Sequence, residues 1–97
     1  MSTEVYHYQF QNDVSSDDIE AALLLAIWGC ESLCGESQTR MDAAHYFDAD
    51  ERTCVIDART KVGINFNRLF VGFVSRELGP DAFLVKRIAE MPVPTAA

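Results

Sequence analysis

His7, Asp57 and Arg59 are residues whose types could support general acid–base chemistry. A histidine oriented by a carboxylate is the minimum arrangement for moving a proton near neutral pH. These residues lie in or next to two alternating stretches, VYHYQF and TCVID, and pairing of these stretches as neighbouring strands would bring His7 near Asp57 or Arg59. One histidine and one carboxylate at no diagnostic spacing are more often an ordinary cross-strand pair. We therefore assign no catalytic residue, and group the three with Tyr46 as the lining of a hypothetical ligand site.

Cys30, Cys34 and His45 are the residues that suggest a metal ion. Zinc takes about four such ligands, usually including close pairs on turns that converge on the ion. Here the two thiols are one helical turn apart, and both fall on the core side of the expected helix. A disulfide between helical neighbours is also geometrically poor. We predict buried free thiols in a reducing compartment, with no metal and no cofactor.

Asp48, Asp50 and Glu51 form a second acidic group, in the run DADE. Calcium binds such oxygen clusters, but a calcium loop needs six or more ligands and usually a glycine at its sharp turn. This run is short and has no glycine, so we predict a solvated turn. The sequence also has no Gly-rich phosphate loop and no Ser nucleophile elbow. These observations lean toward a protein that is not an enzyme.

The charge balance restricts the classes of partner. Fifteen Asp and Glu residues stand against eight Lys and Arg, for a net charge of −7. Such a surface repels nucleic-acid phosphates and anionic membranes, so we expect neither as a direct partner. An acidic domain can instead imitate nucleic acid and inhibit a basic protein, which predicts that its acids form one stripe. The first residues lack the pattern of a signal peptide, and we expect a cytoplasmic protein.

Hydrophobic periodicity predicts the elements that would position these groups. We expect a strand over 5–10, a helix capped by Ser15 or Ser16 that runs to about Cys34, a hairpin over 39–60, a helix from near Thr60 to Gly79 and a strand over 82–88. This order, βαββαβ, is the ferredoxin-like split βαβ pattern of the α+β class: a four-stranded antiparallel sheet with two helices on one face. We expect one domain over 1–90, and a flexible tail over 91–97 because its prolines block regular structure.

The stretch AALLLAIWGC, residues 21–30, is apolar on both sides of the first predicted helix. At 100° per residue, the side that must face the sheet collects Ile19, Ala22, Leu23, Ala26, Cys30 and Leu33. Leu24 and Trp28, with Ala21 beside them, fall among the acids on the opposite side. Because they are four residues apart, Leu24 and Trp28 touch each other, and an exposed patch of this kind usually has a cover.

Two covers are possible for this patch. The loop 36–43 or the proline-rich tail could fold over it, or another chain could bind there, since Trp is a favoured interface anchor. We favour the second: a non-enzymatic protein–protein interaction or self-association module that binds another protein or itself as a homodimer. Its interface would include Ala21, Leu24 and Trp28.

The alternative function is a small-molecule-binding, and potentially catalytic, domain that uses the open sheet face or a dimer groove. In the predicted topology the helices cover one side of the sheet and leave the other to water, a ligand or a second sheet. The side chains predicted on that side are Val5, His7, Gln9, Tyr46, Thr53, Val55, Asp57, Arg59 and Lys86.

Overall fold

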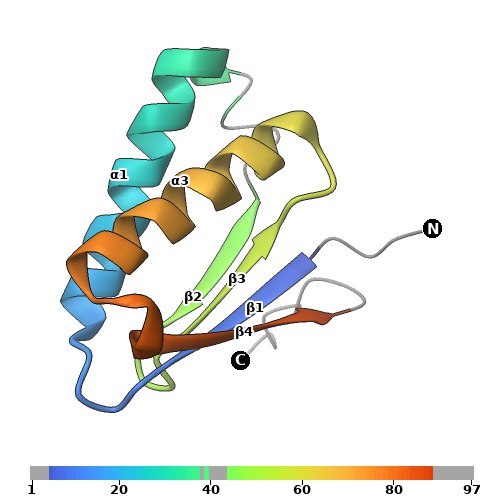
Figure 1. Ribbon diagram of the computed structural model, residues 1–97. Helices are drawn as coiled ribbons and strands as arrows, with labels where there is room; N and C mark the ends of the chain where they lie inside the picture. The colour runs from blue at the N-terminus through green and yellow to red at the C-terminus, as the bar shows by residue number, and fades with distance from the viewer. Residues whose placement is uncertain (1–4, 38, 40–43, 89–97) are drawn as a thin grey trace.

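The computed structural model describes residues 5–37, 39 and 44–88, in which one sheet is covered by a layer of helices (Figure 1). The elements are β1 (Val5–Phe10), α1 (Ser16–Cys34), β2 (His45–Asp48), β3 (Thr53–Asp57), α3 (Lys61–Glu77), the short 3₁₀ helix η1 (Pro80–Ala82) and β4 (Phe83–Ile88). The strands pair antiparallel in the order β2-β3-β1-β4. The predicted ferredoxin-like α+β fold is therefore confirmed.

The helices begin and end where local chemistry predicts. The side chains of Ser15 and Thr60 each accept a hydrogen bond from a backbone N–H of the first turn, at 3.2 and 2.9 Å, and so cap α1 and α3. Past the ends of α1 and α3, Gly35 and Gly79 have φ values of 88° and 92°. This left-handed region favours glycine, which explains why both helices end there.

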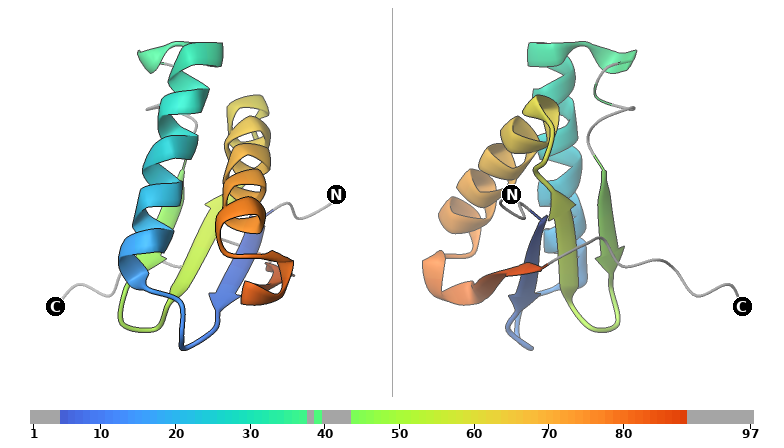
Figure 2. Two further views of the ribbon diagram at one scale, coloured as in Figure 1. Left: turned by 60° about the vertical axis from the view of Figure 1, so that its left-hand side comes forward. Right: turned by 90° about the vertical axis from the view of Figure 1, so that its right-hand side faces the viewer.

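The core lies between the sheet and the two helices (Figure 2). The rings of Tyr8 and Phe10 on β1 meet Phe70 of α3 edge-on, with centroids 5.2 and 6.2 Å apart. On α1, five of the six residues predicted to face the sheet are buried: Ile19, Ala22, Leu23, Ala26 and Cys30. The prediction for the sixth, Leu33, is wrong, because its side chain is 70% exposed on the last turn of α1, which extends past the strands (Figure 1).

Two other expectations concern parts of the chain outside the described residues. The tail over 91–97 is one, and residues 40–43 at the start of the predicted hairpin are the other. Within the described ranges, no helix has both the length and the apolar character needed to cross a membrane.

The start of α3 packs tightly against the end of β3. A Cβ on Gly63 would lie 2.2 Å from the backbone oxygen of Asp57, so any side chain there would force the helix away from the strand. Gly72, in the middle of α3, has open space where a Cβ would be. Packing therefore requires a glycine at position 63 but not at position 72.

We expect Gly63→Ala to lower the free energy of unfolding by about 1–3 kcal/mol, the usual cost of overpacking. Gly72→Ala is the matched control and should raise it by about 0.5–1 kcal/mol, because alanine loses less conformational freedom in a helix. Urea unfolding of dilute protein, followed by far-UV circular dichroism, measures both. Equal effects of the two substitutions would contradict this description of the α3–β3 contact.

Candidate interaction surfaces

Leu24 and Trp28 lie on the side of α1 that faces away from the sheet. Their side chains are 45% and 58% exposed, and the neighbouring Ala21 is exposed as well. The helical phase placed these three residues on this side, although their role as an interface stays a prediction. Most of the two segments that could cover the patch, the loop 36–43 and the proline-rich tail, lies outside the described residues.

Leu25 extends this apolar surface toward α3, a contribution that the sequence did not single out. Together with Ala21 and Phe73 it lines a groove of about 360 Å³ between α1 and α3. The carboxylates of Asp18 and Glu77 belong to the same groove. Leu25 lies on the flank of α1 toward α3, so its exposure depends on where α3 packs, and the periodicity of α1 alone does not contain that information. We call Ala21, Leu24, Leu25 and Trp28 the helix-layer patch.

The other candidate surface is the sheet face away from the helices. The strand register places Tyr46, Val55, His7 and Lys86 in one row across β2, β3, β1 and β4. Val55 thus separates Tyr46 from His7, and two strand spacings put their backbones roughly 9–10 Å apart. Val55 is also buried, as is Val5 on the same face, so this face is less open than its alternation predicted.

Asp57 and Arg59 are the two predicted ligand residues that the structure brings together. The Nε and Nη2 atoms of Arg59 donate hydrogen bonds of 2.9 and 2.7 Å to the Asp57 carboxylate, and its backbone N–H donates one of 3.0 Å. The side-chain hydrogen bond from Arg59 is the main cause that lowers the pKa of Asp57. None of the hydrogen bonds found among the described residues joins either of them to His7.

His7 instead belongs to a hollow on the sheet face. This hollow has a volume of about 360 Å³ and is lined by His7, Gln9, Leu84 and Lys86. Of the four residues predicted to line a ligand site, only His7 takes part. Lys86 was predicted to lie on this face but not to line the site, and Leu84 was not singled out, because the place of each β4 side chain depends on the register between β4 and β1.

The cysteines are free thiols packed around the core. Burial raises the pKa of Cys30 to about 11, with a smaller contribution from Cys34, and raises the pKa of Cys54 to about 12. His45, the third residue considered for a metal site, packs its ring edge-on against Phe66 at 5.2 Å. In the part of the chain that the structure describes, no three His, Cys, Asp or Glu residues are grouped so that they could hold a metal ion.

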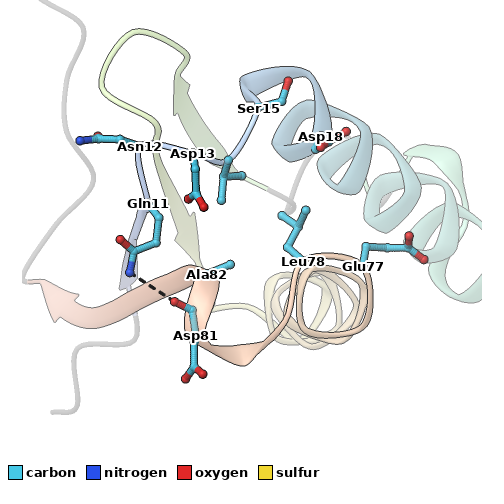
Figure 3. Close-up of a pocket in the computed structure, with 10 residues that line it drawn as sticks. Gln11, Asn12, Asp13, Ser15, Asp18, Glu77, Leu78, Asp81 and Ala82 are labelled. Atoms are coloured by element: carbon cyan, nitrogen blue, oxygen red, sulfur yellow. Dashed lines mark hydrogen bonds between the residues drawn. The ribbon is translucent and has the colours of Figure 1, made fainter.

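Carboxylates gather at the end of the molecule where α1 begins and α3 ends (Figure 3). Asp13, Asp18, Glu77 and Asp81 line an open hollow of about 790 Å³ there. The side-chain amide of Gln11 donates a hydrogen bond of 3.3 Å to the backbone oxygen of Asp81.

A second acidic group lies in the β2–β3 turn. There the Asp48 carboxylate accepts hydrogen bonds from the backbone N–H groups of Asp50 and Glu51, at 3.1 and 3.2 Å. The hypothesis of an acidic nucleic-acid mimic stays a prediction, because an acidic cluster alone does not specify a partner.

Comparisons of this chain with protein-family models, curated proteins and solved structures found no match. The functional argument therefore depends on these surfaces.

We expect Arg59→Gln to raise the pKa of Asp57 toward its ordinary value of 3.8, because the guanidinium that favours the carboxylate is lost. In the wild type, the folded-state pKa lies below the unfolded value, so the contact stabilises the fold above the unfolded pKa. This stabilisation is lost as the pH falls through the folded pKa.

The wild type and the variant should therefore differ in stability by less than about 1 kcal/mol near neutral pH and converge near pH 2, since half of the Arg59 side chain is exposed. NMR titration of the Asp57 carboxyl carbon and urea unfolding at both pH values measure this. An unchanged Asp57 titration in the variant would show that Arg59 does not control this carboxyl group.

Proposed function

We propose that this chain is a non-enzymatic protein–protein interaction module that associates through the helix-layer patch. The exposure of Trp28 and Leu24 on one turn of α1 is the observation that carries the proposal. A contiguous exposed apolar patch that contains Trp is typical of binding surfaces, where a few aromatic anchors supply most of the affinity.

The patch is not needed for the fold. The buried cluster takes its α1 residues from the opposite side, and the partly buried residues packed against it include Ile27 but none of the four patch residues. Polar residues at positions 24 and 28 would satisfy the same core at lower cost in water. At about 25 cal/mol per Å² of apolar area, burial of Leu24, Leu25 and Trp28 by a partner is worth a few kcal/mol.

Two contacts on the sheet face support the non-enzymatic part of the proposal. Asp57, the carboxylate that could orient a histidine, is held by Arg59. It also pairs in register with Val5, whereas His7 pairs with Val55 one row away. A proton-transfer pair of His7 and Asp57 would need a different register or a rearranged ion pair.

Trp28→Glu tests the patch, with Leu33→Glu as the matched control. Both replace an exposed apolar residue of α1 by Glu, but Leu33 lies outside the patch. We expect Trp28→Glu to weaken self-association, or binding to a co-purifying protein, by at least tenfold, and Leu33→Glu to change it by less than twofold. Sedimentation velocity over a concentration series measures self-association, and titration calorimetry with the purified partner measures binding to it. Equal behaviour of wild type and Trp28→Glu in both would overturn the proposal.

A second candidate function is the binding of a small anionic molecule in the hollow on the sheet face. Its support is the pairing of His7 with Lys86 across β1 and β4, which puts a cationic side chain next to an imidazole in that hollow. We expect carboxylated or phosphorylated small molecules to shift the His7 ring resonances in NMR spectra, and Lys86→Gln to abolish the shift. Spectra that do not respond to either class of anion would count against this candidate.

A further inference from the structure

The two helices of the outer layer carry opposite charge. Over Ser16–Cys34, α1 has four carboxylates and no Lys or Arg: Asp17, Asp18, Glu20 and Glu31. Over Lys61–Glu77, α3 has three basic residues against one acid: Lys61, Arg68 and Arg76 against Glu77. The exposed surface of the helix layer therefore changes from an acidic helix to a basic helix. Along α1, the helix-layer patch lies between Glu20 and Glu31.

The charges also form matching rows with the patch. Glu20, Leu24 and Trp28 follow one another at intervals of four on the outside of α1, and Glu31 lies one turn beyond Trp28. Three α3 residues at the same interval form a row of their own: Arg68, Gly72 and Arg76. Glu20, Arg68 and Arg76 are exposed, and among the described residues no ion pair within the chain involves them or Glu31.

Contacts within the chain fix the level of each row along the layer. The helices run antiparallel, so the start of α1 at Asp18 shares a groove with Glu77 at the end of α3. Further along, Gly29 lies against Leu69. At the far end, Asn65 donates to the sulfur of Cys34 at 3.8 Å. Between these levels, Glu20 of α1 lies at the height of Arg76 of α3, and the segment from Trp28 to Glu31 at the height of Arg68.

From this pattern we infer that the partner of the helix-layer patch is a second copy of this chain, with α1 of each copy packed on α3 of the other. The inference rests on the proposed function. A two-fold axis parallel to the helices keeps each residue at its own height and exchanges the two helices. Glu20 then faces Arg76 of the second copy, and Glu31 faces Arg68 of the second copy. The Trp28 ring also meets Arg68 of the second copy, a cation–π contact.

Gly72 gives independent support for this arrangement. Glycine is disfavoured in a helix interior, and the other glycines within the helices have packing reasons, since a Cβ on Gly29 or Gly63 would meet Leu69 or Asp57 below 3 Å. Above Gly72 the monomer leaves open space. In the inferred dimer, Leu24 of the second copy lies at this height, where the missing side chain lets it approach the α3 backbone.

The same charges disfavour the other two-fold packing. With the axis turned across the helices, α1 would lie on α1 and α3 on α3, so that each row would face its own charge. Juxtaposed like charges suppress such a pairing. Two helices of 19 and 17 residues side by side present a surface of roughly 500–600 Å² on each copy. This area per copy is at the low end for a specific interface. We therefore expect a reversible dimer with micromolar affinity.

Paired charge reversals test the inference. One variant carries Glu20→Lys and Glu31→Lys, and the other carries Arg68→Glu and Arg76→Glu. In each variant alone, the substituted row has the same charge as the row that it faces in the inferred dimer, so its self-association should weaken at least tenfold. An equimolar mixture brings opposite charges together again and should form a heterodimer within about threefold of the wild-type affinity. Sedimentation velocity from 5 to 500 µM measures all three, and circular dichroism verifies that each variant is folded.

Two controls change the net charge equally but away from the helix layer: Asp50→Lys with Glu51→Lys, and Lys86→Glu with Arg87→Glu. Both should dimerise like the wild type, whereas a loss in the second alone would indicate a dimer through the sheet and overturn the inference. A monomeric wild type, or a mixture that stays monomeric, also overturns it.

If Trp28→Glu dissociates the dimer while the charge reversals do not, the proposed function stands and only this arrangement fails. If Trp28→Glu has no effect either, and binds a purified partner like wild type, both fail.

Discussion

The burial of one side of α1 against the sheet is the constraint on which the rest of the surface depends. Ile19, Ala26 and Cys30 are completely buried there, and two of these three are small enough to let the helix lie close to the strands. A helix advances by a fixed rotation per residue, so this contact leaves no freedom for the residues on its far side. Once Ala26 and Cys30 face inward, Trp28 must face outward. The patch is therefore a consequence of the core, because α1 cannot turn these side chains inward without breaking its contact with the sheet.

Features that depend on neighbouring residues were predictable from the sequence, and features that depend on distant ones were not. The ends of both helices follow from local chemistry: a serine at position 15 or 16 before the first helix, Thr60 before the second, and the glycine after each. The exposure of Leu33 was mispredicted, because it depends on where the strands end beneath α1. Leu25 was missed for a similar reason, since its surroundings are decided by α3, which lies more than thirty residues away in the chain.

The sheet face shows the same division. Which side each β1 and β3 residue occupies follows from the strict alternation of a strand, and the register agrees with the predicted alternation. The distance between side chains on that face does not follow from alternation, because it depends on which residues stand opposite one another. The pairing of His7 with Val55 moves Asp57 one row away, and the adjacent Arg59 then satisfies its carboxylate. The proposed ligand residues share a face but do not converge on one point.

A surface that binds its own copy must be complementary to itself, which a uniformly charged helix pair cannot be. Segregation of acids on α1 and bases on α3 solves this problem with one sequence, because a two-fold axis exchanges the helices. It also explains two choices that make the isolated chain less favourable: an exposed Trp28 and a glycine in the middle of α3. Each has a cost in the monomer, in unburied apolar area and in helix stability respectively. In the proposed dimer, both costs would be offset by the same contact, in which the bulky side chains of one α1 meet the bare stretch of the other α3.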